Sequence, residues 1–236
     1  MLAARPTGPL AANCYVLAPA PGGDCIVVDP GQEAAEQVEK VLSEHGLTPV
    51  AVLLTHGHFD HVWSAAELGG RHGVPVHVHA RDRHLLTDPA AGVDPGFAAR
   101  LSSLLGEGPH AEPSDLVEVA GGDTLSLAGL EVGVEHTPGH TPEHLSFLIT
   151  DGAFSDQPGY LLSGDFVFAG DIGRPDLLDE AAGGEDTRVE GARHLFASLR
   201  DTFLTLPDHV QVLPGHGAGS ACGKALGALP ATTVGY

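Results

Sequence analysis

An apolar strand that runs directly into a cluster of histidine and aspartate residues constrains this chain more than any other feature. The apolar run Val50–Leu54 is followed by His56, His58, Asp60 and His61. The run is long enough for a buried strand, and ligands of open α/β sheets gather at the carboxyl ends of strands. Imidazole nitrogens and carboxylate oxygens are usual donors for zinc and similar divalent ions. The sequence therefore predicts a metal site at the end of a buried strand.

The spacing of these donors suits two ions rather than one. In a tight loop His56 and His58 can converge on one ion, because Gly57 lets the backbone bend without a Cβ clash. Asp60 and His61 follow one turn later and can reach a second ion nearby. The alternative is that these four polar side chains have a purely structural role, and their crowding argues against it.

Three later turns each place one more metal-type side chain just past a predicted strand. The predicted strands are 130–136, 160–163 and 210–213, and the donors that follow them are His140, Asp165 and His216. Each turn is shaped by glycine or proline, and each alone would indicate only a turn. Together with the first motif they give seven donors at strand ends, which we interpret as one metal centre.

Alternating strand and helix patterns predict two sheets between helical layers in one domain, residues 1–236. Strands are expected at Cys14–Ala18, Cys25–Asp29, Val50–Leu54, Val74–His79, Leu116–Ala120, Thr124–Leu127, Leu130–His136, Leu145–Thr150, Tyr160–Ser163 and Val210–Leu213. Helices are expected at Glu33–His45, Asp60–His72, Arg81–Leu86 and Val189–Leu206. Between Asp88 and Pro113 the pattern indicates either a loop or short helix over the site, or an irregular surface excursion.

Charge and composition argue against several classes of protein. The chain has 31 acidic and 11 basic residues, a net charge of −20, which opposes binding to nucleic acid or to anionic lipid. It has no apolar run of transmembrane length and no apolar signal segment at its start. Its three cysteines form no disulfide framework, which suits a reducing compartment. We therefore expect a cytoplasmic protein without nucleic-acid or membrane partners.

In their order along the chain, the segments THGHFDH, HTPGHT, SGD and LPGHG resemble the motifs of the metallo-β-lactamase-fold superfamily. The resemblance spans nearly the whole chain and implies an α+β fold, an αββα four-layer sandwich with two metals at one edge. The implied ligands are two trios and one bridging carboxylate: His56, His58 and His140; Asp60, His61 and His216; and Asp165. Asp29 matches a structural acid that supports the ligand loop, while a turn-starting aspartate is an equal alternative. His136 and His144, which flank His140, are expected beside the site or at the surface.

A two-metal site of this kind indicates metal-assisted hydrolysis. Two ions lower the pKa of a bridging water, so that hydroxide exists at neutral pH, and they polarise the substrate's carbonyl or phosphoryl oxygen. Asp60 is expected to orient that hydroxide as well as to bind a metal, which makes it the candidate catalytic residue. No G-x-S-x-G elbow or Walker-type loop offers another chemistry. The expected cofactors are two divalent ions, zinc first, with iron and manganese as alternatives.

The two halves of the chain resemble different branches of the superfamily. The first half, with NCYVLAP and VLLTHGHFDHVWSA, is similar to small glyoxalase II-like hydrolases, which cleave thioesters of the hydroxyacylglutathione type. The second half, with SGDFVFAGDIGRPDLL and LPGHGAGSACGKALG, is similar to bacterial persulfide dioxygenases, which use one ferrous ion held by two histidines and one aspartate. The matching positions are His56, His140 and Asp165, although that branch usually lacks the second set of donors found here. We expect a thioester hydrolase, with a mononuclear iron persulfide dioxygenase as the alternative.

Either enzyme implies a small-molecule, thiol-derived substrate, and an acidic protein needs local cations to bind an anionic one. Arg174 and Lys224 are the candidates, although Arg174 could equally form a structural pair with Asp171 or Asp176. Cys222 could carry sulfur in the dioxygenase interpretation, with Lys224 favouring its thiolate, or could simply be a small residue in a turn. A third interpretation is a metal or sulfur binder that has kept the fold without activity.

Overall fold

The computed structural model describes residues 1–89, 91, 96, 99, 111–176, 187–217 and 232–236. The strands in this part of the chain are β1 (Leu2–Thr7), β2 (Ala12–Leu17), β3 (Asp24–Val28), β4 (Thr48–Leu53), β5 (Val76–His79), β6 (Leu116–Val119), β7 (Thr124–Leu127), β8 (Leu130–His136), β9 (Leu145–Thr150), β10 (Tyr160–Gly164), β11 (Val167–Phe168), β12 (Asp171–Ile172), β13 (Gln211–Pro214) and β14 (Thr232–Thr233). The helices are α1 (Ala34–His45), α2 (Phe59–Val62), α3 (Ala65–His72) and α6 (Thr187–Asp201), with 3-10 helices η1 (Ala80–Leu86) and η2 (Phe203–Thr205).

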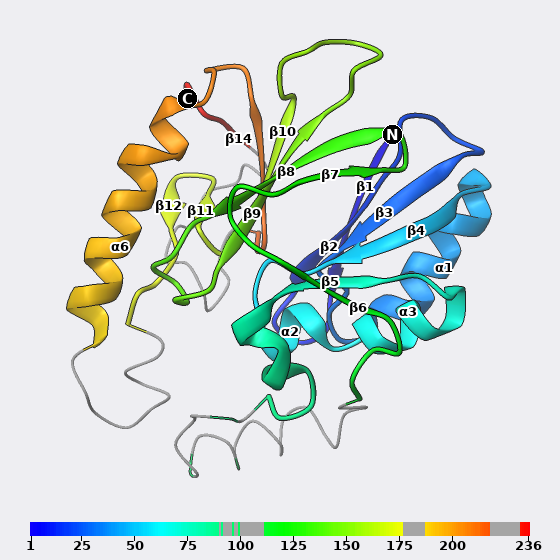
Figure 1. The fold of residues 1–236 in the computed structure, drawn as a ribbon, viewed down its shortest axis with the longest axis horizontal. Coiled ribbons are helices and arrows are strands. Elements are labelled where there is room, and N and C mark those ends of the chain that lie inside the picture. The colour runs from blue at the N-terminus through cyan, green and yellow to red at the C-terminus, as the bar shows by residue number, and fades with distance from the viewer. Residues whose placement is uncertain (90, 92–95, 97–98, 100–110, 177–186, 218–231) are drawn as a thin grey trace.

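Two six-stranded sheets face each other between layers of helix (Figure 1). The first sheet has the order β1-β2-β3-β4-β5-β6 and the second the order β14-β13-β10-β9-β8-β7. Helices α1, α2 and α3 lie beside the first sheet, and α6 lies beside the second (Figure 1). This arrangement is the α+β, four-layer αββα sandwich expected from the sequence.

Side chains along the central strands point alternately to the two faces of the sheet, and this explains how the layers stack. In β3, Cys25 and Val27 pack in the cluster that contains the apolar faces of α1 and α3, while Ile26 and Val28 face the second sheet. A third apolar cluster joins the second sheet to Leu195 of α6. Successive strand side chains point to opposite faces, so strands that are apolar on both faces can serve two cores at once.

Parallel pairing gathers several strand ends at one edge of the sandwich. Strands β3, β4, β5 and β6 are parallel neighbours in the first sheet, and β10 and β13 are parallel in the second. The two sheets are joined at this edge, because the Leu145 amide donates to the Thr55 carbonyl at 2.7 Å and Ala12 forms an isolated bridge with His216. The turns that follow β4, β8, β10 and β13 therefore meet.

The structure corrects one predicted helix. The segment Asp60–His72 is not continuous, because α2 ends at Val62 and α3 begins at Ala65. Ser64 lies in the break, where its amide donates to the Pro30 carbonyl and its hydroxyl to the Gly31 carbonyl, each within 2.8 Å. Contacts with the turn after β3 therefore fix the helix break, and no local sequence pattern encodes them.

Smaller differences lie at other elements. The segment predicted as a helix at Arg81–Leu86 is 3-10, and the helix predicted at Val189–Leu206 ends at Asp201 before η2. Strands β1, β11, β12 and β14 were not predicted. The irregular region expected between Asp88 and Pro113 lies largely outside the described residues. Among the helices that the structure describes, none is both long and apolar enough to span a bilayer.

Candidate metal centre

All seven predicted donors converge at the joined edge of the sandwich. They lie in the turns after β4, β8, β10 and β13 and, for Asp60 and His61, in the short helix α2 that follows the first of these turns; every one except His58 is buried. The donor atoms form three groups whose members lie within 4.8 Å of one another: His56, His58 and His140; His56, His61 and Asp165; and Asp60, His61 and His216. Residues up to 160 positions apart in sequence, from His56 to His216, thus share one site.

The first trio is an arrangement of three imidazole nitrogens around a common point. His58 Nδ1 lies 2.9 Å from His56 Nε2 and 3.1 Å from His140 Nε2. Burial and the neighbouring His140 lower the pKa of His58 to about 3, although Asp60 and Asp165 oppose them. Burial likewise lowers the pKa of His56, with added effects from the surrounding imidazoles. Both rings are therefore neutral at physiological pH, which is the form that binds a metal.

The second trio combines a carboxylate with two imidazoles. Asp60 Oδ2 lies 3.2 Å from His216 Nε2 and 3.7 Å from His61 Nε2. Burial raises the pKa of Asp60, but the adjacent His61 and His216 outweigh burial and hold the pKa below its usual range. Asp60 is therefore a charged carboxylate within the site.

Asp165 lies between the two trios. Its Oδ2 is 3.4 Å from His140 Nε2 and 3.5 Å from His216 Nε2, and its Oδ1 is 3.6 Å from His61 Nε2. A carboxylate in this position can reach donors of both groups, which is the position expected of a bridging ligand.

Hydrogen bonds on the outer side of four histidines turn Nε2 toward the centre. The Nδ1 atoms lie within 3.2 Å of an oxygen in each case: Thr55 Oγ1 for His56, Asp29 Oδ2 for His61, the Arg174 carbonyl for His140 and the Leu10 carbonyl for His216. Because the Thr55 hydroxyl donates to Asp29 Oδ2, His56 must donate from Nδ1. Such partners fix the tautomer and the ring orientation of metal-binding histidines.

Asp29 supports the ligand loop, as the resemblance implied. Its Oδ1 accepts the Thr55 amide at 2.8 Å, and its Oδ2 accepts the Thr55 hydroxyl at 2.6 Å and lies 2.9 Å from His61 Nδ1. Asp29 also adopts a left-handed backbone conformation, with φ of 48°, at the end of β3. One carboxylate therefore joins the end of β3 to two positions of the donor loop.

His144 and His136 differ, although they lie in the same segment. His144 is buried, and its Nε2 accepts the Asp165 amide at 3.1 Å, so its Nδ1 carries the proton and donates to Thr137 Oγ1 at 2.9 Å. Burial lowers the pKa of His144, which keeps the ring neutral for these bonds. His136 is exposed. Neither histidine belongs to the donor groups, and His144 supports the turn that carries Asp165.

The donor set fits divalent metal ions. Within the described residues, His61 Nε2 and both carboxylate oxygens of Asp165 are buried without a hydrogen-bond partner. Buried polar atoms are normally paired, and leaving a charged one unpaired is costly. A cation at the common point of each trio would satisfy these atoms, and mixed imidazole and carboxylate donors suit zinc, iron and manganese.

The three residues predicted to bind substrate are not part of the donor cluster that the structure describes. The Arg174 side chain pairs with Asp176 through two hydrogen bonds, of 3.0 Å and 2.7 Å, which matches one of the two alternatives expected for it. Its carbonyl also contacts His140, so this residue supports the site through its backbone. Cys222 and Lys224 lie outside the described residues.

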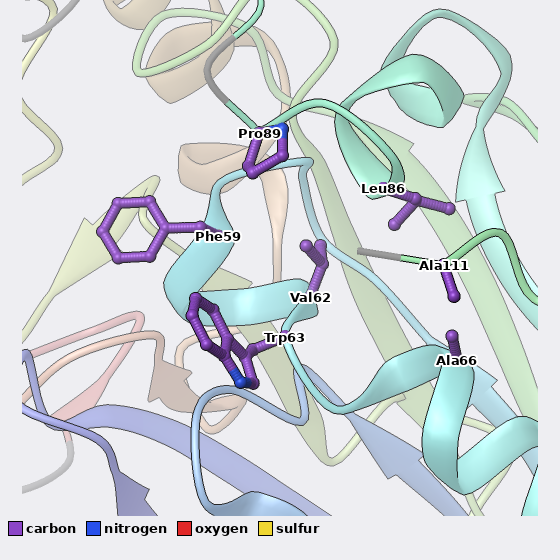
Figure 2. A pocket seen from close by; sticks show the side chains of 7 residues that line it. All are labelled: Phe59, Val62, Trp63, Ala66, Leu86, Pro89 and Ala111. Carbon is purple, nitrogen blue, oxygen red and sulfur yellow. The ribbon is translucent and has the colours of Figure 1, made fainter. Parts of the chain in front are cut away.

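An apolar pocket lies beside the donor loop. Phe59, which stands between His58 and Asp60 in the sequence, lines it together with Val62, Trp63, Ala66, Leu86, Pro89 and Ala111. Figure 2 shows the pocket between α2 and the segments that carry Leu86 and Pro89. Its cavity volume is about 10 Å³, room for no more than one water molecule, so Phe59 packs here against its neighbours beside the donor loop.

Sequence comparisons relate the chain to a known family. A family model described as the metallo-beta-lactamase superfamily matches residues 7–216. An uncharacterized protein of Mycobacterium tuberculosis (strain ATCC 25618 / H37Rv) is 41% identical over 92% of this chain and 91% of its own length. The probable metallo-hydrolase YqgX of Bacillus subtilis is 33% identical over 90% of this chain and 88% of its own. A hydroxyacylglutathione hydrolase of Halorhodospira halophila is 35% identical over 92% of this chain and 66% of its own.

Solved structures extend the comparison. A metallo-beta-lactamase from Staphylococcus aureus has a TM-score of 0.75 at 31% identity, covering 100% of this chain and 60% of its own. The BLEG-1 B3 metallo-beta-lactamase has a TM-score of 0.72 at 30% identity, covering 100% and 95%. TTHA1623, solved in a di-iron-bound form, has a TM-score of 0.69 at 33% identity, covering 99% and 95%. ETHE1 from Myxococcus xanthus, at 21% identity and a TM-score of 0.69, shares the fold.

Proposed function

The chain belongs to the metallo-beta-lactamase superfamily, and from that premise we propose that it is a dinuclear metal-dependent hydrolase that cleaves a thioester. The observation that carries this proposal is the pair of donor trios with the Asp165 carboxylate between them. One ion would be held by His56, His58 and His140, and the other by Asp60, His61 and His216, with Asp165 contacting both.

The site's residues account for the remaining requirements of hydrolysis. When bound, two divalent ions would supply Lewis acidity that polarises the substrate carbonyl and makes water a stronger acid. Asp60 is charged, so it can accept a hydrogen bond from the attacking water and orient it toward the carbonyl carbon. A thiol has a pKa of about 8.5, so a thiolate leaves without a dedicated proton donor.

One relative supports a thioester as the substrate, and another supports the presence of a second metal ion. The Halorhodospira halophila relative is a hydroxyacylglutathione hydrolase, an enzyme that acts on a thioester. The TTHA1623 structure holds two iron ions in a chain of similar fold and length.

The alternative, a mononuclear iron persulfide dioxygenase, needs only His56, His140 and Asp165. These residues do lie together, since His140 Nε2 and Asp165 Oδ2 are 3.4 Å apart. That interpretation leaves the second trio without a role, although its His61 Nε2 is buried and unsatisfied within the described residues. The likeness to ETHE1 concerns the fold and does not favour this activity.

Metal analysis paired with three activity assays tests the proposal. We expect two divalent ions per purified chain, counted separately for zinc, iron and manganese, and hydrolysis of a hydroxyacyl thioester of glutathione. Asp60→Asn should abolish hydrolysis, whereas the exposed Asp88→Asn, with the same change of charge, should not. One ion per chain with oxygen uptake on a thiol persulfide would favour the dioxygenase instead. Cleavage of a β-lactam without thioester cleavage would contradict the proposed substrate.

A further inference from the structure

Helix η1 packs against the donor loop at Gly57, the residue between His56 and His58. The Gly57 amide donates to Asp82 Oδ2 at 2.8 Å. A Cβ at position 57 would lie 2.5 Å from Leu85 Cδ1, 3.0 Å from Leu85 Cβ and 3.2 Å from Asp82 Cβ, so a larger residue here would force the Leu85 side chain to move. The contact between η1 and the loop is therefore both polar and tightly packed.

Asp82 is a buried acid whose carboxylate serves this loop. The residue is 5% exposed, and burying a carboxylate is unfavourable unless it is hydrogen-bonded. Its bond to Gly57 orients the peptide unit between His56 and Gly57. That peptide plane sets the direction in which the chain leaves His56 and enters His58, and these rings meet with 2.9 Å between His56 Nε2 and His58 Nδ1.

The same 3-10 helix also contacts the loop that carries the third member of this trio. Arg81 Nη1 lies 3.1 Å from Glu143 Oε1, in the segment between β8 and β9 that includes His140. Helix η1 therefore touches both loops that supply His56, His58 and His140.

We propose that Asp82 is a positioning residue for the metal held by His56, His58 and His140, because it fixes the Gly57 amide and with it the relative directions of the first two imidazoles. This role rests on the proposed metal centre. In the second trio, His61 and His216 are oriented by Asp29 and the Leu10 carbonyl instead, so the effect should fall on one of the two ions.

Two substitutions separate the hydrogen bond from the charge. Asp82→Ala removes the acceptor, whereas Asp82→Asn keeps an acceptor oxygen in nearly the same place. Zinc affinity can be measured by competition with a chromophoric chelator, with Asp88→Asn as the matched control for lost charge in the same segment. Asp82→Ala should weaken one of the two binding steps by roughly 10- to 100-fold, as loss of an orienting partner typically does. Asp82→Asn should retain most of the affinity.

A second readout uses the metal-free protein. Hydrogen exchange at the Gly57 amide should be faster in Asp82→Ala than in the wild type and in Asp82→Asn. Should Asp82→Ala fail to fold, Asp82→Ser, whose side chain is too short to reach Gly57, replaces it.

The outcomes distinguish this role from the proposed function. A wild-type protein that binds no divalent ion overturns the proposed function and this role together. Wild-type binding of two ions, with both affinities unchanged in Asp82→Ala even if its thermal stability falls, overturns this role alone. Equal weakening of both ions would also overturn it, because the geometry confines the effect to the first trio.

Discussion

Asp29 Oδ2 lies 2.9 Å from His61 Nδ1, so the buried carboxylate holds the imidazole with its Nε2 directed into the donor cluster. Asp29→Asn tests this relationship, since asparagine tolerates the left-handed backbone at this position. Asparagine has only one acceptor oxygen, so its NH2 group must face either the Thr55 amide or the Thr55 hydroxyl and His61. We expect a loss of about 1–3 kcal/mol in the free energy of unfolding and weaker zinc binding. Urea denaturation of the metal-free protein and a zinc titration measure the two effects, and unchanged values in both would contradict this role.

Metal binding should release a proton from His61. Burial lowers the pKa of His61, but the carboxylates of Asp60, Asp165 and Asp29 outweigh burial and raise it to about 9. Near pH 7.5 the metal-free protein therefore carries a proton that the incoming ion must displace. Calorimetric titration with zinc in two buffers of different ionisation enthalpy should count at least one released proton, and fewer as the pH passes 9. A proton count that stays level from pH 7.5 to 10 would argue against it.

The raised pKa of His61 also predicts how the stability of the metal-free protein changes with pH. A histidine with a raised pKa in the folded state stabilises the fold fully below its unfolded value of 6.5, and this stabilisation is lost as the pH rises through about 9. The melting temperature of the metal-free protein should therefore fall between pH 7 and pH 10. In the zinc-loaded protein the proton of His61 is already displaced, so its melting temperature should not show this fall.

His144 should control the turn that carries Asp165, and His136 should not. His144→Ala leaves the buried Asp165 amide without the acceptor now 3.1 Å away, which should cost about 1–3 kcal/mol of stability and weaken metal binding. His144→Gln should recover part of the loss, because its side-chain oxygen can replace Nε2. His136→Ala removes an exposed histidine from the same segment and is the matched control. Equal effects of the two alanine variants would disprove the distinction.

Asp82 should make stability depend on pH in a way that Asp82→Asn removes. Burial raises the pKa of Asp82 from 3.8 to about 6, opposed by the Gly57 amide and augmented by Glu143. An acid with a raised pKa contributes stability that is present below its unfolded value and lost as the pH rises through about 6. The free energy of unfolding of the wild type, minus that of Asp82→Asn, should therefore be about 1 kcal/mol larger at pH 5 than at pH 7.5. A constant difference in urea denaturation would refute the prediction.

Local sequence signals predicted the donors, and the family resemblance predicted the support from Asp29, but other supporting residues were not predicted. Each donor follows a strand and stands in a turn shaped by glycine or proline, so a short segment reveals it. Asp82 acts through a contact with Gly57, which lies 25 positions away, and nothing in the neighbourhood of Asp82 indicates that contact. The break at Ser64 has the same origin. Strand β1 was missed because its sequence, LAARPT, contains arginine and proline, which an edge strand paired only with β2 tolerates.

The convergence of donors from both sheets has a consequence for the folding of the chain. Cys14 and Cys25 are buried and unbridged, so within the described residues no covalent bond ties distant segments together. Ions at the joined edge would act as removable cross-links between turns as far apart in sequence as those of His56 and His216. Since ions that bind only the folded state shift its equilibrium by mass action, the supply of metal in the cell would help to set how long each molecule survives, in addition to whether it is active.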